Sequence, residues 1–271
     1  MKTVAIYGEL GSYTEQAAIK YFGKAVRPVA NRYISEVFES VEKGLDYGIV
    51  PIENSIEGAV TQTYDELTEL RLHIVGETII RINHCLIANR GVKLGSIKRV
   101  YSHPQALGQC KEYLKKLGAH AVPFYDTAGS VKMLMDERMP NIAAIASARA
   151  AGLYKMEILA RDIETDKNNY TRFFIVSRKE MKGKGNKTSL VFTLKSYPGS
   201  LYYALDAFAE NQVNLTYIQS RPVLGQPWKY NFYVDFDGDK NDKNVKAALG
   251  LLRHATKSVK ILGSYAKAEQ M

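Results

Sequence analysis

Cysteine is scarce in this chain of 271 residues, where only Cys85 and Cys110 occur. Two cysteines build neither a disulfide framework nor a cysteine-based metal cluster. Long apolar runs are also lacking, since no stretch approaches the ~18 apolar residues of a membrane-spanning helix. The apolar part of Met1–Gly8 is too short for a signal peptide. We therefore expect a cytoplasmic protein with no membrane association.

Two further patterns are missing. The sequence has no zinc-ligand spacing among its histidines, which are His73, His84, His103, His120 and His254. Gly8 and Gly11 follow a strand-like run but lack the third glycine of a dinucleotide fingerprint. We expect no metal site and no cofactor.

The composition is that of an ordinary globular protein, with 46% hydrophobic, 24% charged and 10% aromatic residues. Lysine and arginine (37) outnumber aspartate and glutamate (28), which gives a net charge of +9. Such an excess suits nucleic acid, a membrane surface or small anions. Because no helix-turn-helix or basic–aromatic motif is present, we expect no nucleic-acid partner.

The first part of the chain alternates strand-like and helix-like segments, which predicts an α/β layered domain with mostly parallel pairing. The expected strands are 4–7, 47–52, 74–82, 85–88, 99–102, 142–146 and 171–176. The expected helices are 12–22, 55–70, 104–117, 128–136 and a short one over 147–152.

A break follows at 178–187, where Lys179, Lys182, Lys184 and Lys187 lie among glycines without apolar periodicity. This composition predicts a solvated linker. Beyond it, strands at 189–194, 213–219, 228–236 and 259–264 and helices at 200–211 and 243–255 follow the order βαββαβ. That order is the ferredoxin-like pattern.

Polar residues gather where predicted strands end and helices begin. Ser12 with Glu15, and Ser102 with Gln105, have the spacing of capping boxes. Asn54 or Ser55 is expected to cap a helix that follows the second strand. In open α/β sheets this edge binds ligands. His103 is either a general acid or base or simply a first-turn residue.

The segment Asn169–Phe174 places the Thr171 hydroxyl beside the Arg172 guanidinium. Arginine is suited to a bidentate grip on a carboxylate. The plainer interpretation is a strand with a buried phenylalanine and a surface arginine. Together with the helix starts, the segment indicates a cleft of hydroxyls, amides, N–H groups and one or more cations, which suits a small polyanion.

These segments resemble the prephenate dehydratase family, and the C-terminal unit resembles an ACT regulatory domain. The matching stretches are Gly8–Ala18, Gly48–Val60, Tyr101–Cys110, Ala143–Tyr154, Asn169–Val176 and, in the C-terminal unit, Pro198–Leu201, Asn214-Leu215 and Gln219–Pro222. The resemblance implies a two-lobed, periplasmic-binding-protein-like catalytic domain over 1–178. Lobe one would take about 1–75 and 160–178, lobe two about 76–159, and the ACT domain 188–265.

The resemblance implies a lyase that converts prephenate to phenylpyruvate in L-phenylalanine biosynthesis, without a cofactor. Thr171 is the residue implied for catalysis, as a hydrogen-bond donor to the departing hydroxyl. Arg172 would hold a substrate carboxylate or order the site, and Phe173 would pack on the ring. The residues expected to orient the substrate are Thr14, Asn54, Ser55, Ser102, Gln105 and Asn169.

The ACT likeness implies L-phenylalanine as an allosteric effector, bound between two copies in a homodimer or homotetramer. The effector residues would be Gly199, Ser200, Leu201, Asn214, Leu215, Ser220 and Arg221. The family's usual Glu-Ser-Arg-Pro reads Gln219-Ser220-Arg221-Pro222 here, and its usual Gly-Ala-Leu has Ser200 in the middle. Effector identity and sign therefore stay open. Two alternative functions also stay open, an arogenate dehydratase and a non-catalytic amino-acid sensor.

Overall fold

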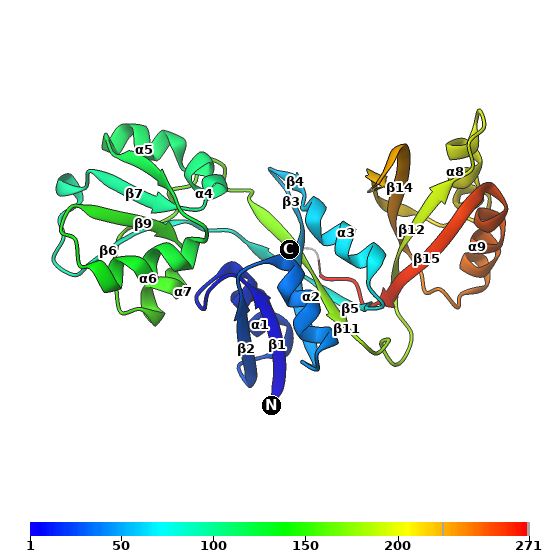
Figure 1. The fold of residues 1–271 in the computed structure, drawn as a ribbon, viewed down its shortest axis with the longest axis horizontal. Helices are drawn as coiled ribbons and strands as arrows, with labels where there is room; N and C mark the ends of the chain where they lie inside the picture. The colour runs from blue at the N-terminus through cyan, green and yellow to red at the C-terminus, as the bar shows by residue number, and fades with distance from the viewer. Residues whose placement is uncertain (224, 270–271) are drawn as a thin grey trace.

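The protein consists of three sheets that lie side by side along its long axis (Figure 1). The computed structural model describes residues 1–223 and 225–269. In Figure 1 the second lobe is on the left, the first lobe in the middle and the C-terminal unit on the right. The prediction of a two-lobed α/β protein with a βαββαβ unit is confirmed.

The first lobe is built around one sheet. Its strands and helices are β1 (Lys2–Tyr7), α1 (Tyr13–Phe22), β2 (Val26–Asn31), α2 (Ile34–Glu42), β3 (Tyr47–Asn54), β4 (Gly58–Ala59), α3 (Thr61–Glu69), β5 (His73–Arg81) and, much later in the chain, β11 (Tyr170–Ser177). The strand order is β2-β1-β3-β11-β5, with β4 paired to β3. β1 is parallel to β2 and β3, but β11 is antiparallel to both β3 and β5.

The second lobe repeats this mixed pairing. Its elements are β6 (Cys85–Ala88), the 3-10 turn η1 (Leu94–Ser96), β7 (Arg99–Ser102), α4 (Pro104–Gln109), α5 (Lys111–Leu117), β8 (His120–Pro123), α6 (Thr127–Glu137), β9 (Ile142–Ala146), α7 (Ala148–Leu153) and β10 (Glu157–Ala160). The strand order is β10-β6-β9-β7-β8. β7 is parallel to β8 and β9, whereas β6 is antiparallel to β9 and β10.

The prediction of mostly parallel pairing is therefore wrong. The chain crosses from the first lobe to the second at 82–84 and returns at 161–169. The strands that follow the two crossings, β6 and β11, run antiparallel to their neighbours. The lobe boundary expected near residue 75 falls inside β5, which lies wholly in the first sheet.

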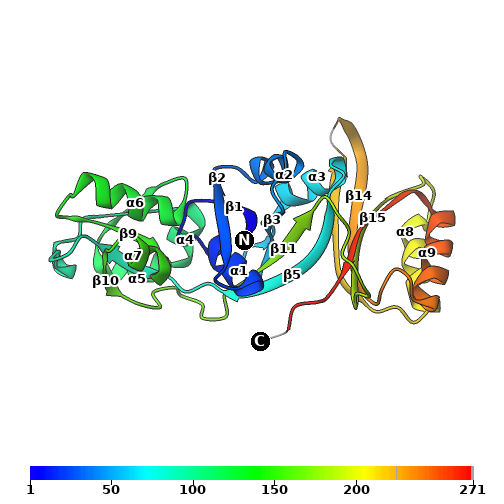
Figure 2. The same cartoon turned by 90° about the horizontal axis from the view of Figure 1, so that it is seen from below.

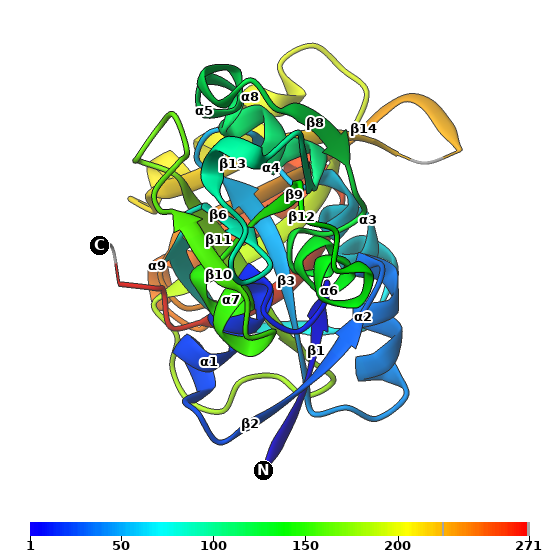
Figure 3. The same cartoon turned by 90° about the vertical axis from the view of Figure 1, so that its left-hand side faces the viewer.

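The C-terminal unit is a four-stranded antiparallel sheet of order β13-β14-β12-β15. Its elements are β12 (Lys187–Leu194), α8 (Ser200–Glu210), β13 (Leu215–Val223), β14 (Gln226–Asp237), α9 (Lys243–Ala255) and β15 (Thr256–Tyr265). Figure 2 shows α8 and α9 covering its outer face. The other face packs on the first lobe, where Tyr233, Leu262 and Tyr265 share a core with Leu67 and Leu72. The β13–β14 hairpin projects to one side in Figure 3.

Several local predictions need correction. The helix expected from residue 55 begins only at Thr61, because a turn and β4 intervene. β2, α2, β8 and β10 were not predicted. The predicted solvated linker at 178–187 is wrong at its last residue, because Lys187 is buried and begins β12. Among the residues that the structure describes, no helix is both long and apolar enough to cross a membrane.

Candidate active site

A cleft of about 530 Å³ opens between the two lobes. The end of β3, the start of β11 and the start of α1 line it from the first lobe, and the starts of α4 and α6 line it from the second. A larger hollow of about 930 Å³ lies at the outer end of the second lobe, around Arg90, Arg138 and Lys155. We take the smaller one as the site, because it holds the polar ends of several strands and helices from both lobes.

Thr171 lies in this cleft with its hydroxyl oriented by Asn54. The Asn54 Oδ1 accepts two backbone N–H groups of the next turn at 3.0 Å each, which fixes the orientation of the amide. Its Nδ2 then faces the Tyr170 carbonyl at 3.1 Å and Thr171 Oγ1 at 3.0 Å. An amide nitrogen donates and has no lone pair to accept with. The Thr171 hydroxyl proton is therefore not used by Asn54 and remains available to donate into the cleft.

The same amide begins a chain of directed hydrogen bonds. Asn54 Nδ2 donates to Asn169 Oδ1 at 2.7 Å, so Asn169 Nδ2 donates onward to Gln109 Oε1 at 2.8 Å. Because Gln109 Oε1 only accepts, the His84 Nε2 at 2.8 Å carries a proton. His84 Nδ1 then lies 2.9 Å from the Tyr13 hydroxyl. Every member of the chain except buried Asn169 lines the cleft.

The N-termini of α1, α3, α4 and α6 all face the cleft. The Ser12 hydroxyl accepts the Glu15 N–H at the start of α1, which confirms Ser12 as the predicted N-cap. The capping box is not completed, because the Glu15 carboxylate accepts the Gly11 N–H and not that of Ser12. Asp126 caps α6 by accepting the Gly129 N–H at 2.7 Å. Helix N-termini attract anions through their unpaired N–H groups and the helix dipole. From the sequence, we expected the positive potential of the cleft to come from N–H groups together with one or more cations.

The lobes are joined behind the cleft by polar contacts. Arg149 of α7 forms a bidentate pair with Glu15 at 2.7 and 2.8 Å, and the Ser147 hydroxyl donates to the Gly11 carbonyl at 2.7 Å. Burial would raise the pKa of Glu15, but the Arg149 contacts and the Gly11 N–H together lower it. A Cβ on Gly11 would lie 2.9 Å from Ala150, so the lobes meet at close range here.

The predicted catalytic and substrate-binding residues divide into three groups. Thr14, Asn54, Gln105, Thr171 and Phe173 line the cleft, and Asn169 lies directly behind them. Ser55 and Ser102 hydrogen-bond to the backbone instead, and Arg172 lies outside the cleft.

Ser55 does not cap a helix. Its hydroxyl donates to the Asn168 carbonyl at 2.8 Å and accepts the Tyr170 N–H at 3.0 Å, which fixes the entrance of β11. Ser102 is buried and donates to the Ile145 carbonyl at 2.6 Å. The predicted Ser102–Gln105 capping box is wrong, because His103 caps α4 through Nδ1, which accepts the Gln105 N–H.

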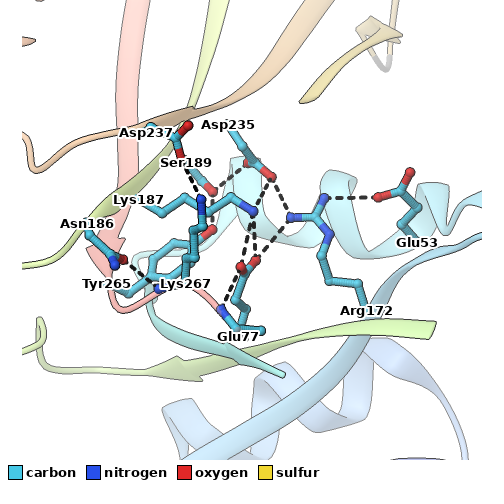
Figure 4. Close-up of polar contacts among 11 residues, drawn as sticks. Glu53, Glu77, Arg172, Asn186, Lys187, Ser189, Asp235, Asp237, Tyr265 and Lys267 are labelled. Carbon is cyan, nitrogen blue, oxygen red and sulfur yellow. Dashed lines mark hydrogen bonds and ion pairs between the residues drawn. The ribbon is translucent and has the colours of Figure 1, made fainter. Parts of the chain in front are cut away.

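Arg172 does not line the cleft. Figure 4 shows it among acidic side chains instead. Its guanidinium bonds Asp235 of the C-terminal sheet at 2.5 Å and Glu77 and Glu53 of the first lobe at 3.2 Å each. Burial lowers the pKa of Arg172, but Asp235 and the other neighbours outweigh this and raise it well above its ordinary value. Of the two roles expected for Arg172, a direct grip on a substrate carboxylate does not fit this position. Ordering the site stays a prediction, since Arg172 holds the first lobe to the C-terminal unit.

Lys187 completes this buried cluster. Its ammonium contacts both Glu77 oxygens at 3.0 and 3.1 Å and lies 3.9 Å from Asp235. Ser189 also donates to Asp235, at 2.6 Å (Figure 4). We call Glu53, Glu77, Arg172, Lys187 and Asp235 the interdomain ion cluster.

The predicted effector residues lie on three segments of the C-terminal unit, 199–201, 214–215 and 220–221. Gly199, Ser200 and Leu201 start α8, and Leu201 and Leu215 pack on the outer helical core. Asn214 donates to Asp237 at 3.0 Å. Ser220 and Arg221 lie on β13, where Arg221 pairs with Asp65 of α3.

Among the cleft residues that sequence reasoning did not single out are Tyr13, His84, Gln109 and Asp126. His84 was dismissed because it has no zinc spacing. The sequence did contain a signal for His84, because the polar pair Asn83-His84 separates two strand-like runs. In the structure this pair lies where the chain crosses between the lobes.

Comparison with known proteins finds one family. A family model described as prephenate dehydratase matches residues 4–181. The chain is 41% identical to "Arogenate dehydratase/prephenate dehydratase 2, chloroplastic" of Arabidopsis thaliana, across 97% of this chain and 72% of that protein.

Two solved structures are similar over nearly the whole chain. A prephenate dehydratase from Arthrobacter aurescens in complex with L-Phe has a TM-score of 0.88 and 36% identity, across 97% of this chain and 89% of that one. A structure titled "GqqA- a novel type of quorum quenching acylases" has a TM-score of 0.89 and 31% identity, across 97% of both chains.

Proposed function

The chain belongs to the prephenate dehydratase family, and we propose that its cleft converts prephenate to phenylpyruvate as a step of L-phenylalanine synthesis. One observation carries the catalytic assignment. The Thr171 hydroxyl accepts from Asn54 and keeps its own proton for a ligand in the cleft.

The reaction needs little from the protein besides binding and one donor. The ring carboxylate leaves as carbon dioxide, its bonding electrons make the ring aromatic, and the hydroxyl on the opposite ring carbon departs. Hydroxide leaves poorly unless a donor stabilises the charge on its oxygen. Thr171 supplies that hydrogen bond, and the N-terminus of α1 favours a carboxylate of the substrate. Phe173 lies on the same face of β11 and packs beside the ring.

Substitution of Thr171 tests this role. Thr171→Ala removes the donor, and one such donor is typically worth about a hundredfold in kcat. Thr171→Ser keeps a hydroxyl and should retain most of the rate. The measurement is phenylpyruvate formation from prephenate by the purified chain. Near-normal kcat in Thr171→Ala would overturn the assignment, and no product from the unmodified chain would overturn the proposed function.

Arogenate, the amino analogue, is a second candidate substrate. The Arabidopsis relative carries both names. Glu57 is an exposed carboxylate of the cleft and is suited to pair with an ammonium group. A kcat/KM for arogenate above that for prephenate, lowered selectively by Glu57→Gln, would assign the amino substrate.

The cleft gives no support to an acylase mechanism. A threonine nucleophile needs an adjacent base to take its proton. The side-chain partner of Thr171 is the Asn54 amide, which cannot take one. A third possibility, a non-catalytic sensor, would show binding of the substrate without product.

We propose that the C-terminal unit is an ACT domain that binds L-phenylalanine between two copies of the chain. Its ferredoxin-like order supports this, as does the L-Phe complex of the Arthrobacter relative. The scattered effector residues fit a site that a second chain completes, in a dimer or tetramer. Calorimetric titration with phenylalanine, combined with the mass of the particle in solution, tests binding and assembly together. We place this activity in the cytoplasm.

A further inference from the structure

A dicarboxylate needs positive charge in the cleft, yet no lysine or arginine is among the described residues that line it. The charged side chains there are carboxylates, Glu57 and Asp126. Beyond the helix N-termini, only a histidine can contribute a full positive charge. Two histidines line the cleft, His84 and His103.

His103 is poorly placed to gain a proton. Its Nδ1 accepts the Gln105 N–H at 3.3 Å and so caps α4. A proton on that nitrogen would remove the cap, and helix caps contribute measurably to stability. Burial also lowers the pKa of His103.

His84 has the opposite arrangement. Its Nε2 already donates to Gln109, so the next proton goes to Nδ1. There the Tyr13 hydroxyl lies 2.9 Å away, and the same hydroxyl lies 2.7 Å from the Asn83 carbonyl. With a neutral imidazole, Nδ1 and this carbonyl compete for one hydroxyl proton. With a proton on Nδ1, His84 donates to Tyr13, Tyr13 donates to Asn83, and every contact is satisfied.

The groups around His84 favour its protonated form, but they do not keep it protonated when the cleft is empty. Glu164 is buried and accepts the His84 backbone N–H at 2.9 Å, and Lys167 lies 3.6 Å from its other oxygen. Burial raises the pKa of Tyr13 and of Cys85 and Cys110 nearby, so these groups stay neutral. Burial also lowers the pKa of His84, against the opposing effects of Gln109 and Glu164. His84 is therefore neutral at neutral pH until more negative charge arrives.

We propose that His84 takes up a proton on Nδ1 when a dicarboxylate enters the cleft, and so supplies the positive charge that no lysine or arginine provides. The proton comes from solvent and returns to it when the ligand leaves. No bond to carbon forms or breaks at His84, which makes it a binding residue. The inference rests on the proposed function, because it assumes a dianionic substrate.

Calorimetry measures this proton directly. The Thr171→Ala variant is titrated with prephenate at one neutral pH in buffers of different ionisation enthalpy. The dependence of the binding heat on the buffer gives the protons taken up, and we expect about one per site. Adding His84→Gln should abolish the uptake, whereas adding His103→Gln should leave it in place. Equal uptake with and without His84, or none in the Thr171→Ala parent, overturns the proposal.

Kinetics gives an independent test in a chain that retains Thr171. KM for prephenate should rise with pH through neutrality, and His84→Gln should raise KM about tenfold and flatten this dependence. Tyr13→Phe keeps the histidine but removes the acceptor of its Nδ1 proton, so the rise in KM should begin at lower pH. An unchanged pH profile in both variants refutes the role of His84. A lack of any phenylpyruvate from the unmodified chain instead refutes the proposed function.

Discussion

Replacing Lys187 by methionine should strongly destabilise the contact between the first lobe and the C-terminal unit. The interdomain ion cluster holds three carboxylates and two cations, Arg172 and Lys187. The side chains of Lys187 and Glu77 are only 10% and 2% exposed. Methionine fills the same space but leaves Glu77 buried without its closest cation. Breaking a buried pair from one side typically costs about 3–5 kcal/mol.

A matched control lies three residues earlier. Lys184 also forms an ion pair, with Asp242 at 2.7 Å, but its side chain is 72% exposed. Lys184→Met should leave the free energy of unfolding unchanged, because water solvates the remaining carboxylate. Urea titrations with a common m-value measure both variants. A loss below about 1 kcal/mol in Lys187→Met, the range of an exposed pair, would refute the view that the cluster is desolvated.

Two further predictions concern packing and pH. Gly263→Ala should destabilise the fold, because its Cβ would collide with the Ile74 backbone of β5, whereas Gly250→Ala, in open space on α9, should stabilise it by about 0.5–1 kcal/mol in thermal unfolding. Arg149→Met should reveal the pH dependence of the Glu15 pair. The pKa of Glu15 is lower in the folded protein than in the unfolded chain. The Glu15–Arg149 pair therefore stabilises the fold at pH values above the ordinary carboxylate pKa. This stabilisation is lost as the pH falls through the lowered pKa of folded Glu15. The unfolding free energies of the two proteins should therefore converge in acid and separate at neutral pH, and a constant difference would contradict this.

Strand and helix positions were predictable where periodicity was strong, but pairing directions were not. The strand at 85–88 and the helix at 243–255 were placed at their observed bounds. β11 was recognised as a strand, yet its antiparallel entry between β3 and β5 depends on the chain returning from the second lobe. The sequence of β11 itself does not indicate the direction from which the strand enters the sheet. Strand β2, with Pro28 in its middle, lacks a clear apolar alternation and was missed.

The candidate site shows the same division. Asn54 and Thr171 were expected together because both lie at strand ends, and they are 3.0 Å apart. Gln109 and His84 come from α4 and the chain crossing, so only the folded chain brings them beside Asn169. Lys187 was grouped with its lysine neighbours, since composition does not show which lysine meets a buried glutamate.

The error over Arg172 has a physical reason that the sequence already contained. Successive residues of a strand point to opposite faces, so Thr171 and Arg172 cannot both face one cleft. Phe173, two residues from Thr171, returns to the cleft face, and Arg172 meets Asp235 on the other. β11 thus has one face toward the cleft and one face anchored to the C-terminal sheet. Because the anchor and the hydroxyl are adjacent on one strand, the buried ion pairs behind β11 fix the backbone that positions Thr171.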